Sequence, residues 1–210
     1  WHSTGYFLLL HVWGGLTGWA TATLRALSLL FGLLAIAVTY RIGRDLLSPL
    51  AGLCAALVLA SSAFFVHYLF ELRVYTLMAL LSALVVWVYL RIITRPTPPS
   101  RGLWLALFAV VAAIFYSHYL ATITLAGLAV YHLLFVPKNR RWWQVVGVGV
   151  AGGAVFLPWV PYLLTGVQMA EDKELLHERA LRAPEAFADF LTMFSNGFVV
   201  LMLGLIVAAV

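Results

Sequence analysis

Long apolar stretches alternate with short polar ones along the whole chain. The apolar runs cover residues 22–40, 49–66, 74–93, 103–117, 119–136, 144–164 and 197–210. About 20 helical residues cross a bilayer, so the continuous run 103–136 must fold back, and the polar residues Tyr116–Tyr119 mark the place. Residues 5–20 are apolar but contain His11 and the glycines Gly14, Gly15 and Gly18, which predicts a short helix that lies at the membrane surface or is partly inserted. The pattern predicts an all-α polytopic membrane protein with about six complete spans and a truncated seventh.

Composition places the chain in a bilayer and excludes a compact soluble domain. Hydrophobic residues make up 64% of the 210 positions and charged residues 10%, whereas charged residues make up about 25% of an ordinary globular protein. The mean hydropathy is +0.99. A soluble chain of this size would expose large apolar patches. The single cysteine, Cys54, cannot form an internal disulfide.

The sparse charges orient the predicted spans. One side carries eight basic residues and one acid, a net charge of +7, and the other carries five basic residues and seven acids, a net charge of −2. Because Lys and Arg concentrate in cytoplasmic loops, the first side is predicted to be cytoplasmic and the second to face outward. The basic residues of the first side are Arg41, Arg44, Arg91, Arg95, Arg101, Lys138, Arg140 and Arg141. The overall charge of +5 therefore reflects orientation, and no nucleic-acid partner is expected.

These features divide the chain into four segments. Residues 1–21 form an outer juxtamembrane segment, 22–164 a six-span bundle, 165–196 an outer loop with a surface helix, and 197–210 a truncated span. The expected location is the plasma membrane, with multiple spans, membrane lipids as neighbours and the active side facing outward. The short connections suit a bacterial membrane. The absence of an initial Met and the end inside an apolar run predict a piece of a longer protein.

Polar residues gather at the outward span ends, most densely in His67–Tyr75. Ionisable groups near membrane depth mark functional sites unless they are solvated. If the preceding helix continues, His67, Glu71 and Tyr75 share one face, whereas Glu71 and Arg73 do not face each other, so each needs another partner. The alternative is a solvated turn whose charges keep the helices from sliding into lipid.

A metal site is a weaker hypothesis for the same residues. His2, His67, His118 and Glu71 are possible ligands, but only His67 and Glu71 have a suitable spacing. No cofactor is expected beyond this possible divalent metal, and His11 and His132 are interpreted as packing residues. The glycines Gly149 and Gly153 predict close packing between helices. No Walker A or dinucleotide-binding motif is present.

Several segments, taken in order, resemble one family. They are His2–His11, Leu24–Leu34, Tyr40–Arg44, Glu71-Leu72-Arg73-Val74-Tyr75, Tyr116-Ser117-His118-Tyr119 and Leu157-Pro158-Trp159-Val160-Pro161. Their succession is similar to that of the glycosyltransferases related to protein mannosyltransferases and lipid A aminoarabinose transferases. The resemblance implies a GT-C fold whose outward-facing active site moves a sugar from a polyprenyl-phosphate donor to a lipid, glycan or protein acceptor.

The resemblance also suggests roles for residues. Arginine suits a departing phosphate anion, so Arg73 and then Arg25 are the expected donor-phosphate ligands. The expected substrate-binding residues are His2, Glu71, Tyr75, His118 and Tyr119. The family's acidic general base would lie before Trp1, so the sequence as given is expected to be catalytically incomplete, and Ser3-Thr4 replaces the family's Pro-Pro pair.

Two other functions share these features. A transporter or flippase of a lipid-linked or amphiphilic substrate would also combine apolar spans with a polar cavity. Such proteins often have inverted repeats or helices broken at mid-membrane, and the sequence shows neither clear internal symmetry nor charge in the middle of a span. A structural scaffold would explain the spans but not the outward grouping of His, Glu and Arg. An Asp-Glu pair just before Trp1 would favour the enzyme.

Overall fold

The computed structural model describes residues 4–162 and, beyond them, 185, 188, 189 and 192. Residues 4–162 form only helices and connections, which confirms the predicted all-α class. The α-helices are α1 (Thr4–Thr17), α2 (Thr21–Leu46), α3 (Pro49–Ser61), α4 (Ala63–Leu69), α5 (Tyr75–Thr94), α6 (Arg101–Ser117), α7 (Thr122–Phe135) and α8 (Arg140–Ala154), and the 3₁₀ helices are η1 (Tyr119–Ala121) and η2 (Leu157–Trp159). The predicted outer loop 165–196, apart from those four residues, and the predicted span 197–210 lie outside the described part.

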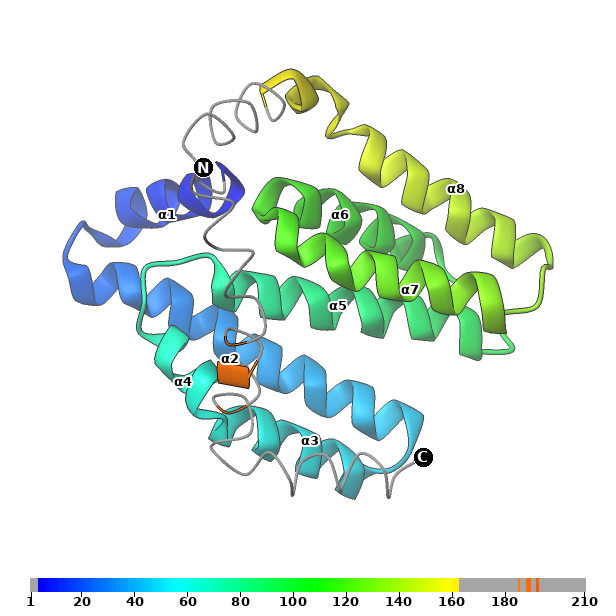
Figure 1. Ribbon diagram of the computed structural model, residues 1–210, viewed down its shortest axis with the longest axis horizontal. Helices are drawn as coiled ribbons and strands as arrows, with labels where there is room; N and C mark the ends of the chain where they lie inside the picture. The colour runs from blue at the N-terminus through cyan, green and yellow to red at the C-terminus, as the bar shows by residue number, and fades with distance from the viewer. Residues whose placement is uncertain (1–3, 163–184, 186–187, 190–191, 193–210) are drawn as a thin grey trace.

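The helices run back and forth between two ends of a bundle (Figure 1). In that view α2, α5 and α7 run from left to right, and α3, α6 and α8 run back, while α1 lies across the left end. The left end carries Glu71 and Arg73 in the α4–α5 turn and is called the polar-turn end below. The opposite end, where α2 and α5 finish with Arg44 and Arg91, is called the arginine-rich end.

Helix α5 forms the centre of the bundle. Eight of its residues are buried, among them Leu81, Val85 and Ile92. These three join one hydrophobic core with Val111 and Ile114 of α6. A helix buried along so much of its length must be apolar around most of its circumference, as the sequence of α5 is. The core therefore holds the start of α5, and with it the polar turn, in a fixed position.

Helices α2 and α3 pack closely because glycines face each other. A Cβ atom added to Gly52 would lie 2.5 Å from the carbonyl oxygen of Tyr40, and one added to Gly43 would lie 2.7 Å from the Cα of Gly52. Small residues allow helix backbones to approach when no aqueous phase drives the helices together. The pair Gly43 and Gly52 thus fixes the spacing of the first two antiparallel helices.

The predicted glycine contact in α8 is only half correct. Gly153 packs on Phe115, as expected, and its neighbour Gly152 contacts Val111. Gly149, however, has no heavy atom within 4 Å of an added Cβ. The α6–α8 contact therefore uses the adjacent pair Gly152 and Gly153 rather than the pair spaced four residues apart.

The number of membrane crossings stays a prediction. In the described part, three helical runs are long and apolar enough to span: Thr21–Leu46, Tyr75–Thr94 and Arg140–Tyr162. The predicted span 49–66 corresponds to α3 and α4, which meet at Ser62 with a bend of 66° and would together form either one broken span or a re-entrant loop. The predicted span 119–136 begins with η1, which leaves 14 residues for α7. Helices α6 and α7 are apolar but shorter than 18 residues.

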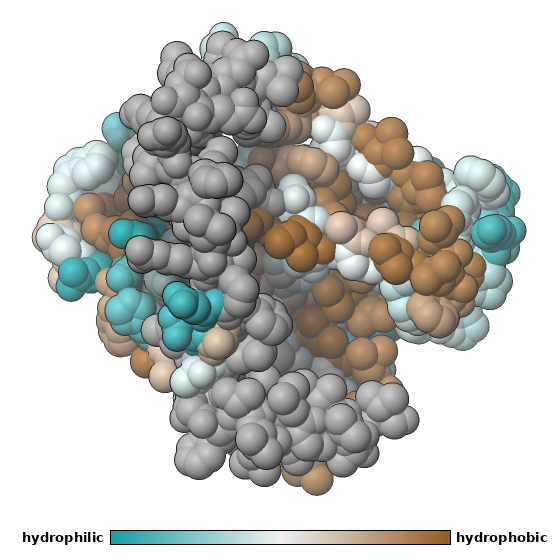
Figure 2. Space-filling model, viewed as in Figure 1, coloured by the Kyte–Doolittle hydropathy of each residue, from teal (hydrophilic) through white to brown (hydrophobic). Residues whose placement is uncertain are grey.

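The surface agrees with a bilayer environment. Figure 2 shows hydrophobic side chains across the middle of one face and hydrophilic residues toward its left and right ends. Leu57, Val58, Leu105 and Leu133 are each more than half exposed. Such continuous apolar exposure is unfavourable in water and expected in lipid.

Side chains at the arginine-rich end tie α5, α7 and α8 together. Buried His132 contacts the Tyr89 hydroxyl through Nδ1 at 2.8 Å and the Trp142 carbonyl through Nε2 at 3.2 Å. Arg141 donates to the carbonyls of Ile92 and Arg95 at 3.2 and 2.6 Å. The interpretation of His132 as a packing residue is therefore confirmed.

A hydrogen bond joins α6 to the segment after α8 at the polar-turn end. The Tyr116 hydroxyl donates to the Val155 carbonyl at 2.8 Å, and the Tyr116 ring also contacts Phe156 and Trp159. We expect Tyr116→Phe to lower the free energy of unfolding by about 1 kcal/mol, because it removes one hydrogen bond and keeps the ring. Denaturation of the purified protein in detergent measures this, with Tyr131→Phe as the matched control. An equal effect of the two substitutions would contradict the role of the hydroxyl.

Candidate functional site

The turn between α4 and α5 forms the core of the candidate site. Helix α4 ends at Leu69, and α5 begins at Tyr75. The hypothesis of one helix running through His67–Tyr75 is therefore wrong. The helix stops because the chain must reverse to enter α5, whose first turn is buried at Thr76 and Leu77. Residues 70–74 form the reversal, and they present their charged side chains at the end of the bundle.

Glu71 lies between a histidine and an arginine. Its Oε1 is 3.3 Å from His67 Nε2, and its Oε2 is 3.3 Å from Arg73 Nε. The first contact confirms the predicted i, i+4 pairing. The second corrects the expectation that Glu71 and Arg73 face apart: in the turn, unlike in a helix, residues two apart can approach. The side chains of His67 and Arg73 are 63% and 65% exposed, so both remain accessible to a ligand.

Two tyrosines complete this cluster. The rings of Tyr68 and Tyr75 lie 4.3 Å apart between centroids, and His67 lies edge-on to Tyr68 at 5.1 Å. The pKa of Arg73 is raised, first by a hydrogen bond with the Tyr75 side chain and then by the charge of Glu71. Tyr75 therefore joins the site through Arg73 and Tyr68 and not through the predicted helical face. Its position orients the guanidinium and leaves Arg73 fully charged.

Arg25 lies on α2 at the same end of the bundle. Leu69 of α4 packs on Gly32 so closely that an added Cβ would be 2.0 Å from Leu69 Cδ2. Seven residues separate Arg25 from Gly32, which places them on one helix face about 10 Å apart along the axis. Arg25 is exposed. It thus projects beyond the end of α4, on the α2 face against which that helix packs.

The segment after α6 reaches the same end from another direction. Ala121 of η1 packs in the core with Val74, the residue before α5. His118, the residue that ends α6, accepts a hydrogen bond from the Leu120 amide at Nδ1, with an N···N distance of 3.2 Å. His118 therefore lies near the start of α5, and its predicted role in substrate binding at an outward span end stays a prediction. His2 and the Tyr119 side chain lie outside the described part, so their assignment stays a prediction.

His118 should make stability depend on pH. Burial lowers its pKa below the ordinary 6.5. The unfolded chain therefore binds more protons between the lowered pKa and 6.5, so the free energy of unfolding should fall as pH decreases through that window and be fully retained above it. Denaturation from about pH 8 to about pH 5 measures the slope. His118→Gln should remove part of it, and an unchanged slope in that variant would refute the assignment.

The arrangement offers little support for a metal. Among the described residues, no group of three or more His, Cys, Asp or Glu side chains is close enough to hold an ion. His67 and Glu71 are adjacent, but Arg73 occupies the second carboxylate oxygen. These side chains are better suited to bind an anion through Arg73 and hydroxyl groups through Glu71.

Tyr68 belongs to the candidate site although the sequence pattern did not indicate a role for it there. From the sequence it was interpreted as one of the tyrosines that commonly lie at a membrane interface. In the structure its ring contacts that of Tyr75 at an interplanar angle of 52°. A possible signal was the i, i+4 spacing of Phe64 and Tyr68, whose rings also meet at 4.9 Å.

One end of this apolar helix bundle carries an exposed arginine, a carboxylate, a histidine and tyrosines. This combination is typical of a membrane protein that acts on a polar, anionic substrate. The comparison with known families is more specific. The family described as dolichyl-phosphate-mannose-protein mannosyltransferase matches residues 2–164. The chain belongs to this family and is a membrane glycosyltransferase of the GT-C type. No curated protein and no solved structure matches it.

Proposed function

We propose that the protein transfers a sugar from a polyprenyl-phosphate donor to an acceptor hydroxyl at the outer face of the membrane. The observation that carries the proposal is the contact of Glu71 with Arg73 in the turn that ends two apolar helices. Family membership supports the reaction class. The outward placement rests on the distribution of basic residues, which concentrate at the opposite end.

Arg73 is assigned to the donor phosphate. In the reaction the acceptor oxygen forms a bond to the sugar's anomeric carbon and loses its proton, while the bond from that carbon to the phosphate oxygen breaks and the phosphate leaves with the electron pair. A guanidinium held in place beforehand stabilises this developing charge without reorganising. Glu71 Oε2 contacts Arg73 Nε at 3.3 Å, and the neighbouring Tyr75 side chain and the charge of Glu71 raise the pKa of Arg73 and so favour its charged form. This arrangement supports a group already oriented for the leaving anion.

Glu71 is assigned to positioning rather than to proton abstraction. Both of its oxygens are already engaged, by His67 and by Arg73. The proton of the acceptor hydroxyl would pass to another group. Arg25 and His118, at the same end of the bundle, are assigned to further contacts with the donor or acceptor.

The polyprenyl tail can reach this site from the lipid. Phe70, directly before Glu71, is 57% exposed, and Val66 one turn earlier is 37% exposed. An isoprenoid chain lying along these side chains would remain in an apolar environment while its phosphate met Arg73. The location of charge next to exposed apolar surface therefore fits an amphiphilic donor better than a free nucleotide sugar.

Proteoliposomes with the full-length protein and a radiolabelled polyprenyl-phosphate hexose test the proposal. An enzyme cleaves the donor, so labelled sugar should appear on an added acceptor mixture or as free sugar while polyprenyl phosphate accumulates. A transporter would instead move the intact labelled donor to the other leaflet. Donor that crosses the membrane without cleavage, across a series of donor sugars, would refute the proposal.

A further inference from the structure

The arginine-rich end contains a cavity that the proposed reaction does not use. It lies between the ends of α2 and α5 and has a volume of about 340 Å³. Its lining residues are Ile42, Asp45, Leu46, Trp87, Leu90, Arg91, Thr94, Arg95 and Pro96. The lining combines apolar side chains, among them Ile42, Leu46 and Leu90, with two arginines. The volume is large enough for a small polar group and too small for a folded partner.

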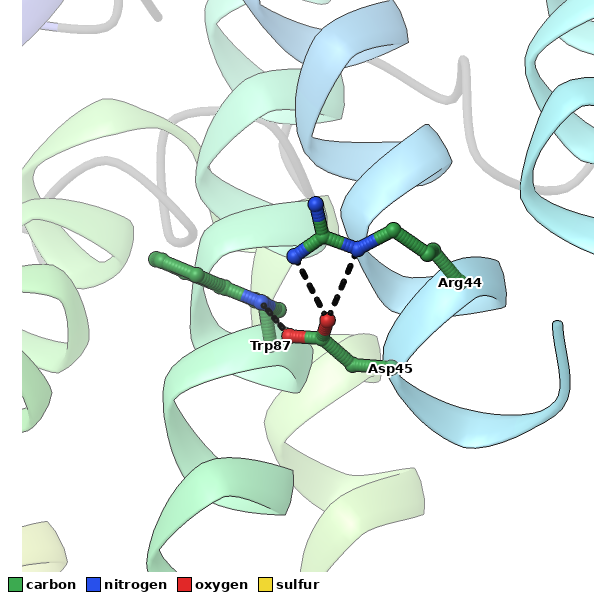
Figure 3. A network of polar contacts seen from close by, with 3 residues as sticks. All are labelled: Arg44, Asp45 and Trp87. Atoms are coloured by element: carbon green, nitrogen blue, oxygen red, sulfur yellow. Dashed lines mark hydrogen bonds and ion pairs between the residues drawn. The ribbon is translucent and has the colours of Figure 1, made fainter. Parts of the chain in front are cut away.

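The single acid in the cavity is already neutralised. Asp45 Oδ1 accepts hydrogen bonds from Arg44 Nε at 3.1 Å and Nη2 at 2.8 Å, and Oδ2 accepts one from Trp87 Nε1 at 3.1 Å. Figure 3 shows the carboxylate held between the guanidinium and the indole. Asp45 carries one negative charge against the three positive charges of Arg44, Arg91 and Arg95, so the surroundings of the cavity keep a net positive charge.

Arg91 is the less satisfied of these two. Its Nε is buried and has no hydrogen-bond partner among the described residues. Its guanidinium lies over the Trp87 ring at 4.8 Å from the centroid, and the ring holds it in place. A buried donor without an acceptor is costly, and a charged one especially so. Arg91 lines the cavity, so an anion there would meet its positive charge, and Arg95, exposed just after α5, adds a second cation.

We propose that this cavity binds the phosphate headgroup of an anionic phospholipid from the leaflet at the arginine-rich end. The cavity lies at the ends of two apolar helices that are long enough to span, which is the depth of lipid headgroups. Basic pockets between helices at this depth recognise anionic lipids. The apolar side chains of Ile42, Leu46 and Leu90 would cover the first methylenes of the acyl chains. A free phosphate would gain nothing from these side chains.

Native mass spectrometry of the purified full-length protein, titrated with phosphatidylglycerol, tests this. Wild type should bind one phosphatidylglycerol more tightly than phosphatidylcholine. The double variant Arg91→Gln with Arg95→Gln should bind it about ten-fold more weakly, as expected for lost charge-assisted hydrogen bonds. The matched control, Arg101→Gln with Arg140→Gln, removes the same charge from the same end without altering the cavity, and should bind like wild type.

Three results would overturn the proposal. The first is equal affinity for the two lipids, and the second is an equal loss of phosphatidylglycerol affinity in both double variants. The third is complete displacement of phosphatidylglycerol by excess inorganic phosphate, which would indicate a general anion site. If the double variant does not fold, the single variant Arg95→Gln replaces it, because Arg95 is exposed and its loss should not disturb the core. It should weaken binding about three-fold, and unchanged binding would count against the pocket.

Discussion

Replacing Arg73 with glutamate should nearly abolish sugar transfer by the full-length protein while leaving its expression unchanged. The substitution removes the cation assigned to the leaving phosphate and places a second carboxylate beside Glu71. Loss of one positioned donor to a developing anion typically lowers turnover about 10²–10³-fold, and charge reversal should cost at least that much. Because Arg73 is 65% exposed, the fold should tolerate the change. Turnover of a labelled polyprenyl-phosphate sugar in proteoliposomes measures the effect.

Two variants make this result interpretable. Arg73→Lys keeps the charge but loses the planar fork, so it should retain part of the activity. Arg101→Glu reverses a charge at the arginine-rich end and should leave turnover near that of wild type. Normal transfer by Arg73→Glu would remove Arg73 from the mechanism, and an equal loss in Arg101→Glu would point to a general charge effect.

Substituting Gly52 with alanine should destabilise the bundle strongly. The new Cβ would lie 2.5 Å from the Tyr40 carbonyl oxygen and 2.9 Å from the Arg44 amide nitrogen. Both are backbone atoms, so no side chain can rotate away and α2 and α3 must separate. Overpacking of this kind costs about 1–3 kcal/mol in the free energy of unfolding, and we expect the upper part of that range. Thermal denaturation in detergent measures it.

Gly127→Ala is the matched control for Gly52→Ala. It lies inside α7, and a Cβ there meets no atom within 4 Å. Alanine is the better helix former by about 1 kcal/mol, so this variant should be as stable as wild type or more so. A Gly52→Ala protein as stable as the Gly127→Ala protein would show that α2 and α3 do not pack as described.

The periodicity of apolar residues was sufficient to predict the helical class, and it located most helices to within a few residues. It did not predict the bend at Ser62, because serine pairs are compatible with a straight apolar helix and the break depends on where α4 packs. Leu69 reaches Gly32 of α2 only if the chain turns there. Contacts between distant helices are not encoded in a local pattern.

The composition of the sequence indicated which segment forms the candidate site but did not predict the geometry of that site. The density of charge in 67–75 pointed to the right segment, and the spacing of His67 and Glu71 predicted a contact that the structure contains. The pairing of Glu71 with Arg73 was missed because it depends on where α4 ends. The cavity beside Arg91 was also missed, since Asp45 and Trp87 are 42 positions apart and only the packing of α2 on α5 joins them.

The two ends of the bundle thus have different roles in this account. At the polar-turn end, Arg73 is exposed and held by a neighbouring acid and a tyrosine, an arrangement suited to a substrate that arrives and leaves. At the arginine-rich end, the guanidinium of Arg91 lies over the Trp87 ring and its Nε is buried. This arrangement suits a ligand that stays bound. The ligands proposed for the two ends both carry a phosphate and an apolar tail. The positive charge of an end therefore does not by itself determine which ligand binds there.

Photo-cross-linking tests the central claim, that the polar turn binds the donor, most directly. A polyprenyl-phosphate sugar with a diazirine on its first isoprene unit is bound to the full-length protein and irradiated, and the labelled peptides are identified by mass spectrometry. We predict labelling of residues 64–75 in the wild-type protein and loss of this labelling in Arg73→Glu. Labelling confined to the segments that line the Arg91 cavity, unchanged in Arg73→Glu, would contradict it.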